Sequence, residues 1–177
     1  MLLMNKFATV ATGTALLAVL WFQQQEIQTV HNDVQEIKAY IIKTNVRINY
    51  TKADEECLTK NIYHEAGVEP AIGKYAVAQV TLNRLRDGRW GKSICKVVYA
   101  PSQFSWTLYN KHLYAQPKGP AWDQSREVAK TVLEKGYRVA GLENSILYHA
   151  DYIKPPVWAR TVVRIQQVGR HIFYKSS

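Results

Sequence analysis

The chain has 177 residues, of which 47% are hydrophobic and 21% are charged, and these proportions exclude disorder over most of its length. Lysine and arginine number 23 against 14 acidic residues, so the formal charge is +9 and the expected partners are anionic: nucleic acid, lipid or cell-wall polymer. The length predicts one domain with an appendage. The two cysteines match no metal or redox motif, but they can form one disulfide.

Residues 7–22 contain no charged side chain and are the first element that the pattern predicts. As a helix they would span about 24 Å, which is short of the ~30 Å hydrocarbon core of a bilayer. Lys6 precedes them and the next basic residue is Lys38, so the charge bias predicts a cytoplasmic N-terminus. The run ends in bulky residues rather than a small-residue cleavage site, which favours an uncleaved signal anchor over residues 1–24. A cleaved signal and a buried helix are the alternatives.

A heptad pattern follows the apolar run and predicts a helical, coiled-coil-like stalk over residues 25–50. Such a stalk would pair weakly with a second copy of the chain, and the alternative is one amphipathic helix that folds back on its own domain. The seam positions alternate in steps of three and four residues and are Ile27, Val30, Val34, Ile37, Ile41, Thr44 and Ile48. The remaining residues, 51–177, carry a net charge of +8 and form the predicted globular domain.

The globular part shows helical patterns first and strand patterns last. Thr51 to Asp54 can cap a helix, and Asp87-Gly88 ends the next one. Residues 100–121 hold prolines, glycines and many rings, which is typical of a loop. Helices followed by a small antiparallel sheet indicate an α+β fold. The predicted helices are 54–66, 70–86, 91–99 and 124–135, the last capped by Asp123, and the predicted strands are 145–149, 160–166 and 170–175.

The densest chemistry lies where the first globular helix ends, at Tyr63-His64-Glu65. A glutamate held against apolar surface has a raised pKa and can act as a general acid near neutral pH. A solvated glutamate at a helix end is the alternative. Val68 stands where a zinc-peptidase HExxH motif needs its second histidine, so we expect no metal site. The GxSxG and phosphate-loop patterns are absent, and we expect no cofactor.

Glu69 lies four residues after Glu65, so a continuous helix would place both carboxylates on one face. A pair of carboxylates is the usual apparatus for cleaving a glycosidic bond. The alternative is that Glu69 sits at the N-terminus of the next helix, where the helix dipole favours an acid.

The stretch 57–106 resembles the SleB/CwlJ family of cell-wall hydrolases, which is named for spore-cortex-lytic enzymes, and the resemblance extends over about residues 54–175. This family commonly reads Glu-Ala-Arg-Gly-Glu, whereas this chain has Gly67 and Val68 in place of the arginine and glycine. The matching pieces are Asn61-Ile62-Tyr63, Glu65-Ala66, Glu69-Pro70, Gly73, Ala76-Val77-Ala78, Leu82-Asn83-Arg84, Val97-Val98-Tyr99, Gln103-Phe104-Ser105-Trp106, Tyr148-His149-Ala150, Pro156-Val157-Trp158 and Gly169-Arg170-His171-Ile172-Phe173-Tyr174.

The resemblance implies a lysozyme-like helical domain that acts on peptidoglycan glycan strands as a lytic transglycosylase or a glycosidase, with Glu65 as its general acid and base. Asn83 is expected to tie down a loop by hydrogen bonding, and His171 is expected to be a structural histidine with satisfied hydrogen bonds. The expected substrate-binding residues are Glu69, Tyr63, Gln103, Phe104, Ser105, Trp106, His149 and Trp158.

Peptidoglycan lies outside the cytoplasmic membrane, so the resemblance agrees with an exported chain. It implies the outer face of the inner membrane, towards the periplasm, with release into the periplasm as a further step. In this oxidising compartment a Cys57–Cys95 disulfide is expected. A phage signal-anchor endolysin for host lysis is our first interpretation. A bacterial wall-remodelling enzyme and a non-catalytic peptidoglycan-binding or lysis-accessory protein are the alternatives. No nucleic-acid motif is present, and we expect no nucleic-acid partner.

Overall fold

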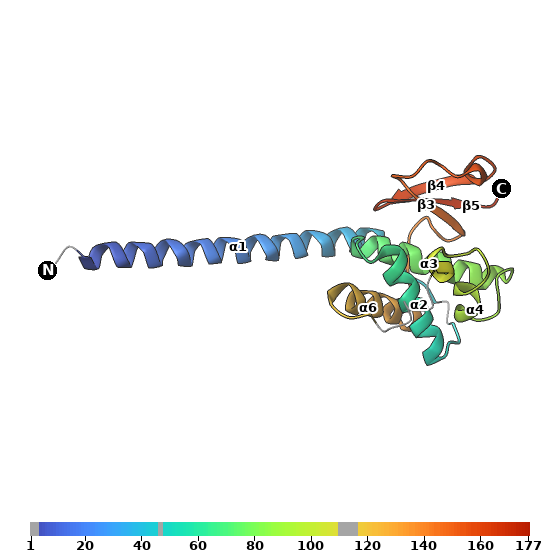
Figure 1. Cartoon of the computed structure of the whole chain (residues 1–177), viewed down its shortest axis with the longest axis horizontal. Coiled ribbons are helices and arrows are strands. Elements are labelled where there is room, and N and C mark those ends of the chain that lie inside the picture. Colours follow the sequence, from blue (N-terminus) through green and yellow to red (C-terminus); the bar gives the residue numbers. More distant parts are fainter. Residues whose placement is uncertain (1–3, 46–47, 110–116) are drawn as a thin grey trace. The chain divides into compact units, whose positions relative to one another are not determined.

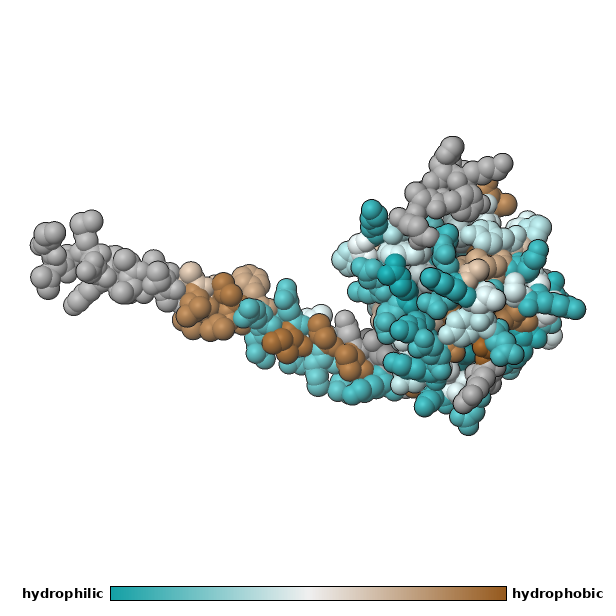
Figure 2. Space-filling model, turned by 90° about the horizontal axis from the view of Figure 1, so that it is seen from below, coloured by the Kyte–Doolittle hydropathy of each residue, from teal (hydrophilic) through white to brown (hydrophobic). Residues whose placement is uncertain are grey.

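The computed structural model describes residues 4–45, 48–109 and 117–177 (Figure 1). The chain divides into two compact units, Met1–Ala39 and Tyr40–Ser177. In the first unit, helix α1 (Met4–Tyr40) runs without a break through the expected anchor and the start of the expected stalk. Figure 2 shows apolar side chains along this helix, and the exposed ones are Leu16, Leu17, Val19, Leu20, Trp21, Phe22, Ile27, Val30 and Val34. Within the described residues, no helix combines the length and the apolar character that a membrane crossing requires.

The end of α1 at Tyr40 shortens the helical stalk that the heptad predicted. The next residues form strand β1 (Ile41–Lys43), in which Ile41 pairs with Val139. Ile48, the last seam position, packs against the core of the second unit. The β-branched residues Ile41 and Ile42 favour a strand wherever a partner strand is in reach, and this tertiary pairing outweighs the helical period.

Four helices of the second unit begin and end close to their expected positions, and they are α2 (Lys52–Ala66), α3 (Ala71–Asp87), α4 (Ile94–Val98) and α6 (Pro120–Glu134). Thr51 and Asp54 form the expected capping box at the start of α2. Gly88 ends α3 in the left-handed conformation, with φ of 81°. The predicted cap Asp123 instead lies inside the first turn of α6, because Pro120 begins that helix. A short helix, α5 (Trp106–Tyr109), interrupts the predicted loop.

Within the described ranges, the strands form two antiparallel sheets. Strand β1 pairs with β2 (Tyr137–Val139), which was not predicted. The three strands expected near the C-terminus are β3 (Leu147–Ala150), β4 (Val163–Val168) and β5 (His171–Lys175), and their order in the sheet is β3-β5-β4. A 3-10 helix (Val157–Arg160) lies between β3 and β4. The predicted α+β fold with a small C-terminal antiparallel sheet is therefore confirmed.

Helix α3 lies between the three-stranded sheet and the helices α2, α4 and α6 (Figure 1). Its predicted apolar face, Ile72, Ala76 and Val80, packs with residues of the strands such as Phe173. Asn83 on the same helix donates to the carbonyl oxygens of Leu142 and Ser145 at 2.9 and 2.7 Å, which confirms its expected role in holding a loop. A second apolar cluster fills the space between the helices and contains Leu58, Ile62, Ala78, Leu82, Val98 and Val132.

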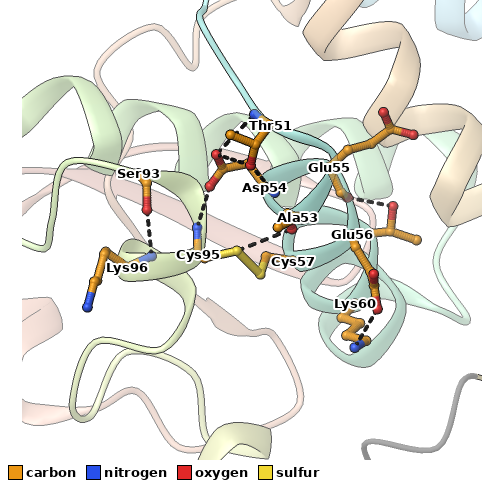
Figure 3. Close-up of a disulfide and its surroundings, with 11 residues drawn as sticks. Thr51, Ala53, Asp54, Glu55, Glu56, Cys57, Lys60, Ser93, Cys95 and Lys96 are labelled. Carbon is orange, nitrogen blue, oxygen red and sulfur yellow. Dashed lines mark hydrogen bonds and ion pairs between the residues drawn. A yellow bond between two sulfur atoms is a disulfide. The ribbon is translucent and has the colours of Figure 1, made fainter.

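A disulfide between Cys57 and Cys95 joins α2 to α4, as expected (Figure 3). Next to it, the backbone N–H of Cys95 donates to the Asp54 carboxylate at 3.0 Å, so a hydrogen bond and a covalent bond connect the same two helices. Helix α2 is thereby fixed at its first two turns. Glu65 lies near the other end of this helix, eight residues after Cys57.

Candidate active site

A cleft of about 580 Å³ opens beside the C-terminal end of α2. Its walls come from α2, α3, the segment 102–108, strand β3, the segment 152–158 and strand β5. The residues that line it are His64, Glu65, Arg84, Ser102, Gln103, Ser105, Trp106, Leu108, Tyr148, His149, Ala150, Tyr152, Ile153, Pro156, Trp158 and His171. Among these described residues, Glu65 is the only carboxylic acid.

Glu65 is held in the cleft by a hydrogen bond from the Tyr148 hydroxyl to its Oε2, at 2.8 Å. Burial raises the pKa of Glu65 above its usual value, while the Tyr148 hydrogen bond and the positive charge of Arg84 act in the opposite direction. A carboxyl group with a raised pKa keeps its proton closer to neutral pH, which a general acid requires. Burial and the Glu65 charge hold the pKa of Tyr148 well above its usual value, so this residue stays a hydrogen-bond donor.

Arg84 approaches the cleft from the buried side of α3. Its Nε donates to the carbonyl oxygen of Ile146 at 2.8 Å, and its guanidinium carbon lies 4.8 Å from the centroid of the Phe104 ring. Its Nη1 is buried and has no hydrogen-bond partner among the described residues. The Nδ1 of His171, on β5, is also buried, and no residue of the described ranges hydrogen-bonds it, so this histidine differs from the satisfied structural histidine that was expected.

Five of the expected substrate-binding residues line the cleft together with Glu65: Gln103, Ser105, Trp106, His149 and Trp158. The Trp106 indole donates to Asn61 Oδ1 at 3.0 Å, and its ring stacks on His64 with the centroids 4.3 Å apart. Both ring nitrogens of His149 already have partners, because Nδ1 hydrogen-bonds the Ala150 carbonyl and Nε2 hydrogen-bonds the Tyr174 hydroxyl.

Two expected substrate-stacking rings lie away from the cleft. Phe104 is buried in the core between the helices. Tyr63 packs edge-on against His64 and Trp122, with centroid distances of 5.2 and 5.7 Å. Both rings therefore support the residues that line the cleft rather than lining it themselves.

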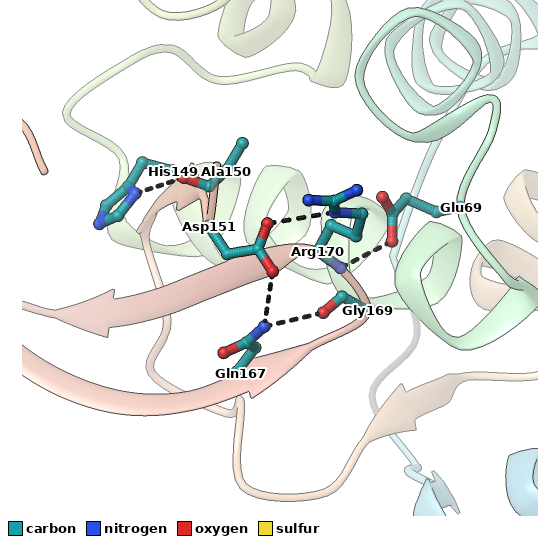
Figure 4. A network of polar contacts seen from close by, with 7 residues as sticks. All are labelled: Glu69, His149, Ala150, Asp151, Gln167, Gly169 and Arg170. Atoms are coloured by element: carbon teal, nitrogen blue, oxygen red, sulfur yellow. Dashed lines mark hydrogen bonds and ion pairs between the residues drawn. The ribbon is translucent and has the colours of Figure 1, made fainter. Parts of the chain in front are cut away.

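Glu69 is buried outside the cleft and connects two turns of the chain (Figure 4). Its Oε2 accepts a hydrogen bond from the backbone N–H of Arg170 at 2.9 Å, and its carbonyl oxygen accepts one from Lys74 Nζ. A Cβ at Gly169 would overlap the Glu69 carboxylate, so the turn before β5 needs glycine here. Glu69 thus joins the α2–α3 turn to the β4–β5 turn, and its role in this structure is to hold the two turns together.

Comparison with known proteins is consistent with this geometry. The profile of the cell wall hydrolase family matches residues 68–174, which is more than half of the chain. This chain belongs to the cell wall hydrolase family. The expected SleB/CwlJ-type relationship is thereby confirmed. The matched range begins three residues after Glu65, so the position of this acid in the cleft comes from the structure.

Similar members of the cell wall hydrolase family include spore cortex-lytic enzymes. That of Oceanobacillus iheyensis is 29% identical over 131 residues, which are 74% of this chain and 45% of that protein. That of Bacillus subtilis is 28% identical over 134 residues, which are 75% of this chain and 41% of that protein. The chain thus spans about half the length of these curated relatives.

Two solved structures resemble about three quarters of this chain. The catalytic domain of the Bacillus cereus SleB protein aligns with a TM-score of 0.55 and 25% identity, over 76% of this chain and 98% of that one. The catalytic domain of the germination-specific lytic transglycosylase SleB from Bacillus anthracis aligns with a TM-score of 0.58 and 25% identity, over 73% of this chain and 100% of that one.

Arg84 and Tyr148 were not predicted as site residues, although both lie in pieces that match the family, Leu82-Asn83-Arg84 and Tyr148-His149-Ala150. Arg84 had a readable signal, because it continues the buried 72-76-80 series of α3 at the same four-residue spacing. A permanent cation on an apolar helix face calls for a partner. Tyr148 lies 83 residues from Glu65, and no local pattern indicates their contact. Within the described ranges, no group of three His, Cys, Asp or Glu side chains is placed to hold a metal ion.

Proposed function

We propose that this protein cleaves the glycan strands of peptidoglycan as a lytic transglycosylase, with Glu65 as its general acid and base. The observation that carries the proposal is the single carboxylic acid among the described residues of the cleft. Hydrolysis by the usual routes needs a second carboxylate about 5–9.5 Å away, as a nucleophile or to activate water. Membership of the cell wall hydrolase family and the likeness to the Bacillus anthracis enzyme support the same substrate and reaction.

One carboxyl group is enough for this reaction. Glu65 donates its proton to the bridging oxygen while the bond between that oxygen and C1 of the sugar breaks. The C6 hydroxyl of the same sugar then bonds to C1 and gives its proton to the Glu65 carboxylate. The acid is regenerated, no water is consumed, and the new end is a 1,6-anhydro sugar. Tyr148 stabilises the intermediate carboxylate through the hydrogen bond that it already donates.

The lining of the cleft suits a chain of sugars. The rings of Trp106 and Trp158 offer flat surfaces for the apolar faces of pyranoses, and Gln103 and Ser105 offer hydrogen bonds to hydroxyl or N-acetyl groups. Tyr152 and Ile153 are exposed along the same cleft and would extend its contact with the glycan.

Product analysis of purified sacculi digested in ¹⁸O-labelled water tests this reaction. We expect fragments that end in anhydro-muramic acid, that are one water lighter than the hydrolytic products, and that carry no solvent oxygen at the new end. Reducing ends labelled with ¹⁸O would show a hydrolase instead. Sacculi that remain intact would contradict glycan cleavage altogether, and the wall-binding alternative would then be favoured.

We also infer that the N-terminal segment anchors the protein at the outer face of the inner membrane, for phage-driven host lysis. The uncharged run 7–22, the single preceding Lys6 and the exposed apolar side chains of α1 support this location. The run is shorter than a bilayer span, so its hold is expected to be marginal and sensitive to the membrane potential.

Fractionation of cells that express a C-terminally tagged chain tests the anchor, before and after an uncoupler collapses the potential. We expect uncleaved protein in the membrane first and in the periplasm afterwards. A variant with Ala11→Leu, Thr12→Leu, Gly13→Leu and Ala15→Leu should stay in the membrane under both conditions. A mature N-terminus near residue 23 would contradict the anchor.

A further inference from the structure

Arg84 is a buried cation that lacks a direct counter-ion. Only 5% of its surface is exposed, and its Nη1 makes no hydrogen bond within the part of the chain that the structure describes. No carboxylate among the described residues lies within ion-pair distance of its guanidinium group. Its Nε donates a hydrogen bond to the carbonyl oxygen of Ile146. Burial lowers the pKa of Arg84, and the charges of Tyr148 and Glu65 raise it.

An uncompensated charge in the interior is costly, and native proteins rarely keep one without a use for it. Burial raises the pKa of Glu65, and proton uptake by this acid removes the negative charge that acts on Arg84. Among the described residues that line the cleft, Glu65 is the one acid whose carboxylate can balance this charge once its proton has left. Arg84 is also the one permanent cation among the described residues that line the cleft.

We propose that Arg84 is the counter-charge for the Glu65 carboxylate that forms when the proton passes to the glycosidic oxygen. This inference rests on the proposed function and adds the residue that stabilises its charged intermediate. An interaction that strengthens only as charge develops lowers the barrier of the chemical step without tightening substrate binding. Arg84 acts through Glu65 and is therefore a positioning residue, whereas Glu65 is the catalytic one.

The surroundings of Arg84 hold its charge in place. Its guanidinium group packs over the Phe104 ring, and the neighbouring Asn83 fixes the same 142–146 loop whose Ile146 carbonyl Arg84 binds. The other titratable side chains that line the cleft with Glu65 are His64 on α2, Tyr148 and His149 on β3, Tyr152 after β3, and His171 on β5. Burial lowers the pKa values of His64 and His171, which disfavours a positive charge on either ring, so Arg84 is the permanent cation of the cleft.

Steady-state kinetics of Arg84→Met and Arg84→Lys on soluble, uncrosslinked peptidoglycan glycan strands tests this inference across pH. We expect Arg84→Met to lower kcat about 10- to 100-fold with KM little changed. Its alkaline limb of kcat/KM should move to higher pH, because Glu65 holds its proton more tightly once the cation is gone. Arg84→Lys keeps the charge and should retain the parental limb with a smaller loss of kcat.

Arg138 is the matched control, because it is a buried arginine, 8% exposed, that also donates to backbone carbonyls but lies outside the cleft. Arg138→Met should lower the unfolding midpoint and leave the pH profile unchanged. If Arg84→Met keeps the parental alkaline limb, Arg84 is structural and the inference fails. The inference also fails if the lysine and methionine variants lose equal activity at every pH. A parental enzyme that leaves the glycan intact would instead refute the proposed function.

Discussion

Glu65→Gln is expected to abolish glycan cleavage, with a loss of at least 10²- to 10⁴-fold in rate, while the protein stays folded. The amide has nearly the shape of the neutral carboxyl group and can accept the hydrogen bond from Tyr148, but it has no acidic proton to give. Release of soluble fragments from purified sacculi measures the rate, and thermal unfolding checks the fold. A folded variant that clears sacculi at the parental rate would remove Glu65 from the mechanism.

The raised pKa of Glu65 predicts how the activity of the parental enzyme and the stability of Glu65→Gln depend on pH. Because burial raises the pKa of Glu65, the parental enzyme should stay active to a higher pH than an exposed glutamate would allow, and lose activity as pH rises through that raised pKa. A pKa raised by folding contributes stability below the unfolded-state pKa, and this contribution is lost as pH rises through the folded-state pKa. Glu65→Gln should therefore gain stability relative to the parent at alkaline pH.

Glu69→Gln is the control for this experiment, because it makes the same chemical change four residues away and outside the cleft. The amide oxygen can still accept from the Arg170 N–H, but the bond loses its charge assistance, which costs about 1–2 kcal/mol of stability. We expect a lower unfolding midpoint, a mild loss of rate and an unchanged pH profile. A loss as large as that of Glu65→Gln would indicate a second catalytic carboxylate.

The elements that were predictable from the sequence are those whose signals are local. The Thr51–Asp54 capping box and Gly88 mark helix ends within a few residues, and the structure has them in these roles. The end of α1 was not predictable in this way. A heptad that continues to Ile48 is equally compatible with a longer helix, and only the pairing of Ile41 with Val139, far along the chain, decides for a strand.

In the candidate site, too, local signals were predictable from the sequence and long-range contacts were not. The resemblance and the apolar neighbours indicated Glu65, and the acid lies in the cleft. The roles around it depend on long-range contacts. Glu69 looked like the partner of Glu65 by spacing, but the break at the α2–α3 turn directs it to the Arg170 N–H instead. Tyr148 reaches Glu65 from a strand 83 residues along the chain, and Arg84 acts on it electrostatically from the next helix, so their effects on Glu65 depend on the folded structure.

Loss of the Cys57–Cys95 disulfide is the change expected to cost most in stability. The two cysteines are 38 residues apart, and in the chain-entropy account a loop of this size stabilises the folded state by about 3–4 kcal/mol. For a domain of this size, such a loss lowers the unfolding midpoint by about 10 °C. Thermal unfolding of the Cys57→Ser/Cys95→Ser double variant, beside the parental protein with and without reductant, measures the effect.

Reductant should not change the unfolding midpoint of the double variant, whereas it should lower that of the parental protein to nearly the same value. Activity should fall less than stability. The Asp54 carboxylate still accepts from the Cys95 N–H after reduction, so α2 keeps one contact with α4 at the end remote from Glu65. Parental protein isolated from an oxidising compartment should show no free thiol by non-reducing mass spectrometry. Two free thiols, or a variant with the parental midpoint, would show that these helices are held by packing and hydrogen bonds alone.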